Sequence, residues 1–288
     1  MKLGLDSYSY HLAFGAHPDF QPTKKMNLFQ FIDRVKELGL DGFQIDPMHL
    51  ASRDENYLQE ILFYAKEQDL FLEYGAMGID ASHLLKELDI CHQLESEVLR
   101  TFIGFDRYNK KINIQKEISQ AIANLNLVKR KAEQMNIKIA IENHGDVNSD
   151  ELIFIIKQVA SPNIGICLDL GNTLMTFEDP IVAVEKMAPY AFTTHFKDYA
   201  IQLTNYGFKV CGVALGDGNI DLFQPLKILK EKTYLDRIIL EIPVEAERVE
   251  IPFLKKEDDF VKRSVIYARN VLEIKSINFI DASFIYTG

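Results

Sequence analysis

The sequence predicts an α/β fold, a single-domain (β/α)8 barrel that spans all 288 residues. Short runs rich in β-branched and aromatic residues alternate with longer segments whose apolar residues recur at helical spacing. This alternation implies parallel strands joined by crossover helices. No change in composition marks a domain boundary, and no glycine-rich phosphate loop follows the first strand. Both observations favour a closed barrel over an open nucleotide-binding sheet.

Each unit of the first half begins with a short apolar run. The predicted strands are Lys2–Asp6, Asp41–Asp46, Leu70–Gly75 and Val98–Gly104. The helices that follow them are predicted at Leu28–Leu38, Glu55–Gln68, Ala81–Leu94 and Ile114–Met135. In the first helix Leu28, Phe31, Ile32 and Val35 share one face, and Gly39 is expected to end it in a left-handed conformation.

The second half repeats the same unit. Its predicted strands are Ile137–Glu142, Ile164–Asp169, Tyr190–His195 and Arg237–Glu241, and its helices are Ser149–Ala160, Pro180–Met187, Leu222–Lys230 and Phe260–Ile274. Ser149 is expected to cap its helix, and Asp221 the helix after it. Residues 198–218 form a longer excursion with a predicted hairpin at 205–207. The aromatic segments 11–22 and 199–215 are expected either to close over a site or to contact another subunit.

Composition narrows the class of protein. An apolar fraction of 47% argues against disorder. The net charge of −10, with no basic block, disfavours nucleic acid as a partner. The longest apolar runs, such as 152–156, are far shorter than the roughly 20 residues of a membrane-spanning helix. We therefore expect no membrane partner. The three cysteines form no Cys-x-x-Cys pair and no disulfide-dense pattern, so we expect a cytoplasmic protein.

Four consecutive strands of the second half end in residues that can bind a metal ion. These residues are Glu142, Asp169, His195 and Glu241. A barrel carries its active site at the C-terminal ends of its strands, and neighbouring strands lie ~4.8 Å apart, so the four side chains can converge. One acidic residue at a strand end commonly caps the next helix, but four in succession favour a metal site. Three carboxylates and one imidazole suit Mn²⁺, with Mg²⁺, Co²⁺ or Zn²⁺ as alternatives.

The stretches around these residues also form recognisable motifs. They read I-A-I-E-N-H-G-D (139–146), G-I-C-L-D-L-G-N (165–172), T-T-H-F-K-D (193–198), L-G-D-G-N-I-D (215–221) and L-E-I-P (240–243). Together they resemble the xylose isomerase-like TIM barrels, a superfamily that includes sugar isomerases, ketose 3-epimerases, inosose dehydratases and endonuclease IV. The motifs are specific to the superfamily rather than to one reaction, and the N-terminal half is similar only in general character.

The resemblance implies one divalent metal ion on the four predicted ligands and a reaction on a small-molecule carbohydrate. The implied enzyme is an isomerase or epimerase that acts through an enediolate on a ketose, sugar acid or polyol ketone. Glu142 and Glu241 would then also move protons, one on each face of the substrate. A dehydratase or another lyase shares the first step and is the alternative, as is a non-catalytic sugar-binding protein.

Two departures from the family pattern limit the reaction. Residues His144–Asn148 stand where ketose 3-epimerases tend to have an Arg and a Glu, and Asn172 stands where they have a His. Both departures disfavour 3-epimerase specificity. They disfavour an endonuclease IV-type nuclease more, because its trinuclear zinc site needs further histidines.

Five more residues are candidates for substrate binding. Lys197 lies two residues beyond His195, on the same side of the strand, and could bind a substrate oxygen or form a salt bridge. His144 could contact substrate or orient a ligand carboxylate, and Asn172 could bind substrate or cap a helix. Asp46 and Glu73 are candidate acceptors for sugar hydroxyl groups, because an inward-facing acid is costly unless it is paired or hydrated. A homo-oligomer is also possible.

Overall fold

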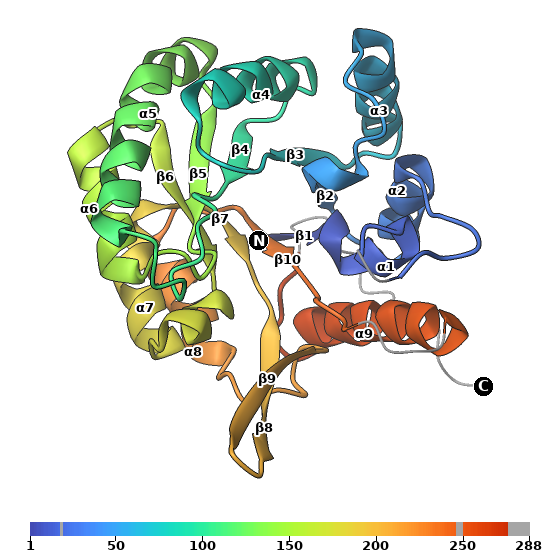
Figure 1. Cartoon of the computed structure of the whole chain (residues 1–288). Helices are drawn as coiled ribbons and strands as arrows, with labels where there is room; N and C mark the ends of the chain where they lie inside the picture. Colours follow the sequence, from blue (N-terminus) through green and yellow to red (C-terminus); the bar gives the residue numbers. More distant parts are fainter. Residues whose placement is uncertain (18–19, 246–249, 276–288) are drawn as a thin grey trace.

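A computed structural model of the chain describes residues 1–17, 20–245 and 250–275. Its main sheet has eight parallel strands in the order β10-β1-β2-β3-β4-β5-β6-β7, which confirms the predicted (β/α)8 fold (Figure 1). The strands are β1 (Lys2–Asp6), β2 (Gly42–Ile45), β3 (Phe71–Gly75), β4 (Val98–Thr101), β5 (Lys138–Glu142), β6 (Ile164–Asp169), β7 (Ala191–His195) and β10 (Arg237–Leu240). Phe196 closes the barrel: its amide donates to Ile239, and its carbonyl accepts from the Glu241 amide.

Helices connect the strands and surround them. They are α2 (Leu28–Glu37), α3 (Glu55–Glu67), α4 (Ala81–Gln93), α5 (Ile114–Met135), α6 (Ser149–Val159), α7 (Pro180–Met187), α8 (Phe223–Lys232) and α9 (Glu250–Asn270). A short α1 (His11–Phe14) follows β1. Helix α9 begins ten residues before the predicted Phe260. The many charged residues before Phe260 led to the prediction of a loop. In the structure they belong to the helix, whose few buried apolar residues include Phe253 and Val261.

Two predicted helix caps can be compared with the structure. Asn148, rather than Ser149, caps α6: its side chain accepts from the Glu151 amide, and the Glu151 carboxylate accepts from the Asn148 amide. Such a reciprocal pair satisfies two backbone amides, whereas a serine cap alone would satisfy one. Asp221 accepts from the first amides of α8, as predicted.

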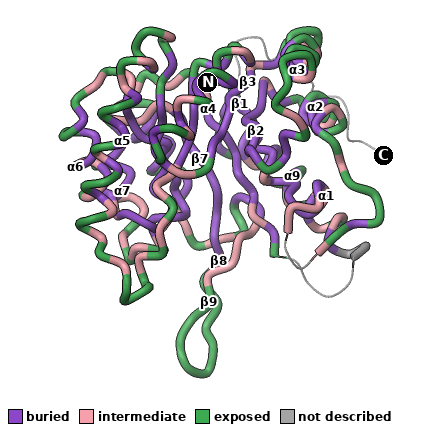
Figure 2. The backbone as a smooth tube through the Cα atoms, turned by 45° about the horizontal axis from the view of Figure 1, so that its top comes forward, coloured by how far each residue is buried: buried purple, intermediate pink, exposed green. Residues whose placement is uncertain are grey.

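The hydrophobic core lies between the strands and the surrounding helices, and the strands are buried almost throughout (Figure 2). Apolar side chains from β1 and β2, such as Leu3, Leu5 and Phe43, face outward and pack against the surrounding helices. Polar side chains are also enclosed, among them Gln44, Glu73 and others that lie below the candidate site. Within the described ranges, no helix is both long enough and apolar enough to span a membrane.

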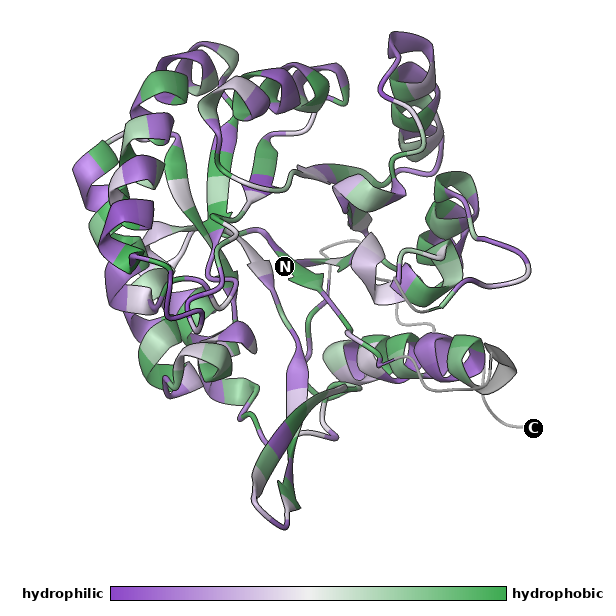
Figure 3. Cartoon of the chain, viewed as in Figure 1, coloured by the Kyte–Doolittle hydropathy of each residue, from purple (hydrophilic) through white to green (hydrophobic). Residues whose placement is uncertain are grey.

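The excursion after β7 forms the predicted hairpin, β8 (Asp198–Thr204) and β9 (Gly207–Val213), which projects from the barrel (Figure 1). Ile201 pairs with Val210 and Leu203 with Phe208, so these four side chains share one apolar face. Leu203 is 90% exposed, and in Figure 3 green apolar stretches alternate with purple hydrophilic ones along this hairpin. The two roles predicted for the 199–215 segment, closure over a site or contact with another subunit, stay predictions. The predicted 11–22 segment lies partly outside the described residues.

Candidate metal centre and active site

The four predicted ligands meet at the C-terminal end of the barrel. Glu142, Asp169 and His195 are the last residues of β5, β6 and β7, and Glu241 directly follows β10. One donor atom from each residue lies within 4.8 Å of the others, and all four side chains are buried. Because β6 and β7 pair Asp169 with His195 in register, the barrel itself places these donors side by side.

One nitrogen of His195 has the surroundings of a metal ligand. His195 Nδ1 lies 3.4 Å from Glu142, 3.7 Å from Asp169 and 3.6 Å from Glu241, in each case to a carboxylate oxygen. It is fully buried and makes no hydrogen bond within the described part of the chain. A buried nitrogen without a partner costs free energy, so a cation among these oxygens fits the donor set.

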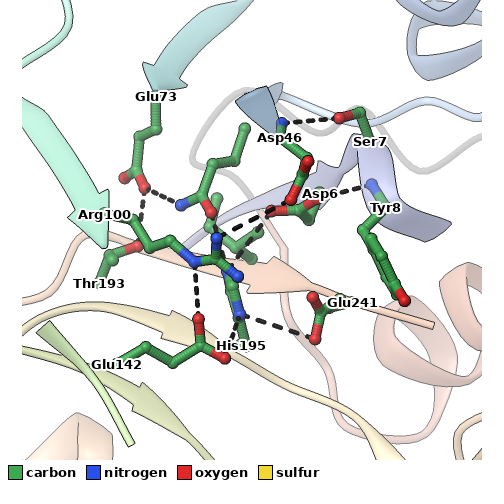
Figure 4. A network of polar contacts seen from close by, with 12 residues as sticks. Asp6, Ser7, Tyr8, Asp46, Glu73, Arg100, Glu142, Thr193, His195 and Glu241 are labelled. Atoms are coloured by element: carbon green, nitrogen blue, oxygen red, sulfur yellow. Dashed lines mark hydrogen bonds and ion pairs between the residues drawn. The ribbon is translucent and has the colours of Figure 1, made fainter. Parts of the chain in front are cut away.

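A hydrogen-bonded chain beneath the site fixes the orientation of His195 (Figure 4). Gln44 on β2 donates its amide N–H to Glu73 over 2.9 Å, so its carbonyl oxygen faces His195 Nε2 at 2.8 Å. Thr193 donates to the same Glu73 oxygen over 2.8 Å. In this arrangement Nε2 donates its proton to Gln44, and Nδ1 is the nitrogen that faces the carboxylates and would bind a metal ion once its own proton has left.

Arg100 on β4 neutralises one of the ligands. Its Nε lies 2.6 Å from Glu142 Oε2, and both side chains are buried. Burial alone would raise the pKa of Glu142, but Arg100, with His195 and His144, holds this pKa well below its usual value. Sequence reasoning missed Arg100. The available signal was a lone arginine in the otherwise uncharged strand V-L-R-T.

Asn172 is part of the site and orients two ligands. Its side-chain amide donates to Glu142 over 3.0 Å and to Asp169 over 2.8 Å, while its backbone amide donates to the other Asp169 oxygen. Asn143 clamps the backbone of Asp169 with two further hydrogen bonds of 2.8 Å. These contacts hold the carboxylates of β5 and β6 in one arrangement.

Lys197 bridges the other side of the site. Its ammonium group lies 2.6 Å from Asp169 and pairs with Glu241. Burial alone would lower the pKa of Lys197, but Asp169 and Glu241 raise it well above its usual value, so the side chain stays charged. Burial would raise the pKa of Glu241, whereas Lys197 and His195 lower it. Burial also raises the pKa of Asp169, against an opposing effect of Lys197.

A cavity of about 320 Å³ opens above these residues. Its lining includes Lys197, Glu241 and Arg100, and also Asp46, His144 and Asn172, three of the predicted substrate-binding residues. Met48, Met77, Phe102, Met175, Tyr8, Tyr199 and Pro243 complete the lining. Burial raises the pKa of Asp46 to about 6 although Arg100 opposes this shift.

Glu73 occupies a different place from the other predicted substrate-binding residues. It is completely buried below the ligands and, among the described residues, is absent from the lining of the cavity. Its carboxylate contacts Gln44 and Thr193, and it lies 3.8 Å from Arg237 at the start of β10. These contacts indicate that Glu73 holds Gln44, which in turn orients His195.

Comparisons with known proteins identify the family to which this fold belongs. A family model described as xylose isomerase-like TIM barrel matches residues 32–262. The 3-oxo-isoapionate decarboxylase of Pectobacterium atrosepticum is 27% identical over 224 residues, which cover 77% of this chain and 78% of that protein. The uncharacterized protein YihM of Escherichia coli is 29% identical over 225 residues, which cover 75% of this chain and 65% of that protein.

Solved structures show the same fold at lower identity. A D-psicose 3-epimerase crystallised with D-fructose has a TM-score of 0.72 at 17% identity, over 94% of this chain and 99% of that one. The IOLI protein with a bound zinc atom has a TM-score of 0.70 at 17% identity, over 95% and 98% of the two chains. The family match and the strand-end residues lead to one conclusion: this chain belongs to the xylose isomerase-like TIM barrel family.

Proposed function

We propose that this protein is a divalent-metal-dependent isomerase or epimerase that acts through an enediolate on a ketose, sugar acid or polyol ketone. The observation that carries the proposal is the convergence of Glu142, Asp169, His195 and Glu241 beside Lys197, under a cavity of about 320 Å³. Mn²⁺ is the proposed ion, and a structural relative holds zinc. When bound, the ion would polarise the substrate's carbonyl and hydroxyl oxygens and stabilise negative charge on them.

The side chains around the cavity have distinct roles in this proposal. Glu241 faces the cavity and accepts the proton from the carbon next to the carbonyl. Lys197, held as an ammonium group, donates a hydrogen bond to the oxygen on which charge develops. Glu142 returns a proton from the opposite face. His144 and Asp46 bind substrate hydroxyl groups, and Asn172 holds Glu142 and Asp169 in place.

A lyase that decarboxylates an oxo sugar acid is the second candidate, and one observation favours it. Glu142 is pinned by Arg100 and Asn172 and is absent from the cavity lining described here, so Glu241 is the better placed of the two proton carriers. Decarboxylation needs one carrier: the electrons of the breaking C–C bond form an enolate, CO₂ leaves, and the carbon takes one proton. The decarboxylase relative named above supports this alternative.

Incubation of the Mn²⁺-loaded protein in D₂O separates the two reactions. Ketoses, polyol ketones and 3-oxo sugar acids are supplied one at a time, and the products are identified by NMR and mass spectrometry. The first proposal expects an isomeric product that carries solvent deuterium at the reacting carbon. A product lighter by CO₂ would establish the lyase instead. Absence of metal-dependent turnover and of deuterium exchange across the panel would contradict both.

A further inference from the structure

A second cavity adjoins the proposed catalytic one. It measures about 390 Å³, and we call it the outer cavity. His144 and Met175 line both cavities, so the two spaces share a wall. The remaining lining consists of Phe105, Asp106, Arg107, Tyr108, Gly145, Leu174 and Phe177. Three aromatic rings line each cavity, but Lys197 and Glu241 are in the described lining of the catalytic cavity alone.

Hydrogen bonds between three barrel loops fix the shape of the outer cavity. The Tyr108 hydroxyl, after β4, donates to the carbonyl of Met175, after β6. Arg107 donates to the Asp146 carbonyl, after β5, and to Glu151 at the start of α6, both over 3.0 Å. The Asp146 side chain accepts from the Gly104 amide over 2.6 Å. The walls are therefore built by cross-links between loops, and one of these cross-links holds the Tyr108 ring by its hydroxyl.

Phe177 occupies an unusual position in this wall. Its φ is +57°, in the left-handed region that glycine and asparagine favour and that is strained for a bulky residue. The side chain is 79% exposed, so burial does not compensate for that strain. Its ring meets the Tyr108 ring edge-on, with centroids 6.1 Å apart. A strained residue with an exposed ring at the edge of a cavity points to a ligand that covers the ring.

We propose that the outer cavity binds a second ring of the substrate, so that the reacting sugar is a glycoside or a similar two-ring conjugate. The inference rests on the proposed function for the ring that reacts beside Lys197. Tyr108 and Phe177 supply a platform for a ring with an apolar face, which a pyranose and an aromatic aglycone both have. Met175 adapts to the shape of such a ring, and His144 lies at the junction of the two cavities.

Three non-reacting probes with one sugar in common test the subsite. Methyl β-D-glucopyranoside, phenyl β-D-glucopyranoside and cellobiose are titrated into the Mn²⁺-loaded protein, and dissociation constants are measured by NMR. We expect at least one two-ring probe to bind about fivefold or more tightly than the methyl glycoside, from the usual contribution of one aromatic contact. The phenyl and cellobiose arms distinguish an aromatic from a sugar second ring.

A pair of variants tests whether the tighter binding of two-ring probes depends on the outer cavity. Phe177→Asn, which suits the left-handed backbone, should remove the preference for two rings and leave binding of the methyl glycoside within about twofold. Phe63→Asn changes an equally bulky exposed phenylalanine on α3 and should alter neither. Equal binding of all three probes, no binding of any, or a preference that survives Phe177→Asn would overturn the subsite. Deuterium exchange with single-ring ketoses tests the proposed function separately, so the two claims can fail independently.

Discussion

Replacing Gln44 by leucine tests whether the chain below the site sets the tautomer of His195. Gln44 makes two buried hydrogen bonds, of 2.8 Å to His195 Nε2 and 2.9 Å to Glu73. Leucine keeps a similar volume and removes both. His195 can then place its proton on either nitrogen, and Nδ1 is no longer reserved for a metal ion.

Gln44→Leu should change two quantities, the metal affinity and the free energy of unfolding. Removing a partner that orients a ligand histidine typically lowers metal affinity by about 10- to 100-fold. Each buried group left without its partner costs about 1–3 kcal/mol, so Gln44→Leu should also lower the free energy of unfolding. Thr193→Val is the matched control, because it removes the other hydrogen bond to Glu73 over 2.8 Å and leaves His195 Nε2 paired. It should destabilise the fold by a similar amount and change metal affinity much less.

Isothermal titration of the metal-free protein with Mn²⁺ measures the affinities, and ¹⁵N NMR of the histidine ring reports its tautomer. At a pH high enough for the imidazolium of His195 to lose one proton, wild type should keep the remaining proton on Nε2, whereas Gln44→Leu should show a mixture of tautomers. Gln44→Leu should also bind Mn²⁺ more weakly. The reasoning is refuted if Gln44→Leu binds Mn²⁺ within about twofold of wild type. It is also refuted if Thr193→Val weakens binding as much as Gln44→Leu does.

Three further predictions follow from the site and from one buried acid. Glu142→Gln and Glu241→Gln should each abolish turnover while circular dichroism shows an intact fold; retained turnover would exclude the proposed proton transfer. Burial would lower the pKa of His195, but Cys167 and the carboxylates of Glu241 and Glu142 raise it well above its usual value, so Mn²⁺ must displace a proton. Titration calorimetry should therefore show tighter binding at pH 8 than at pH 6, and equal affinities would contradict this. Burial raises the pKa of Glu257 to about 8 from 4.5, so the folded state binds the extra proton between these values and stability falls as pH rises through them. Chemical denaturation should show the stability difference between wild type and Glu257→Gln changing by up to about 1.4 kcal/mol per pH unit in that window, and a constant difference would contradict it.

The sequence was sufficient for the barrel and for the predicted cluster of ligands. Alternation of strand and helix patterns determines a parallel sheet, and such a sheet brings its strand ends together whatever their separation along the chain. Glu142, Asp169, His195 and Glu241 could therefore be grouped because each ends a strand. Lys197 follows from its spacing of two residues.

The side chains that support the ligands were beyond the reach of the sequence. Gln44 and His195 are 151 positions apart, and Arg100 and Glu142 come from different strands, so no local spacing links them. Gln44 is the single polar residue of β2 and Arg100 the single charged residue of β4, a pattern that does not show which neighbour each side chain meets. The start of the last helix was mispredicted for a different reason. The first residues of α9 are mostly charged, and the few apolar residues among them are too widely spaced to indicate a helix.

Anomalous diffraction from crystals grown with Mn²⁺ tests the central claim most directly. We predict a single strong manganese peak within coordination distance of Glu142, Asp169, His195 Nδ1 and Glu241, and the loss of that peak in Asp169→Ala. A manganese ion bound elsewhere, or a filled site in which these four side chains point apart, would contradict the account.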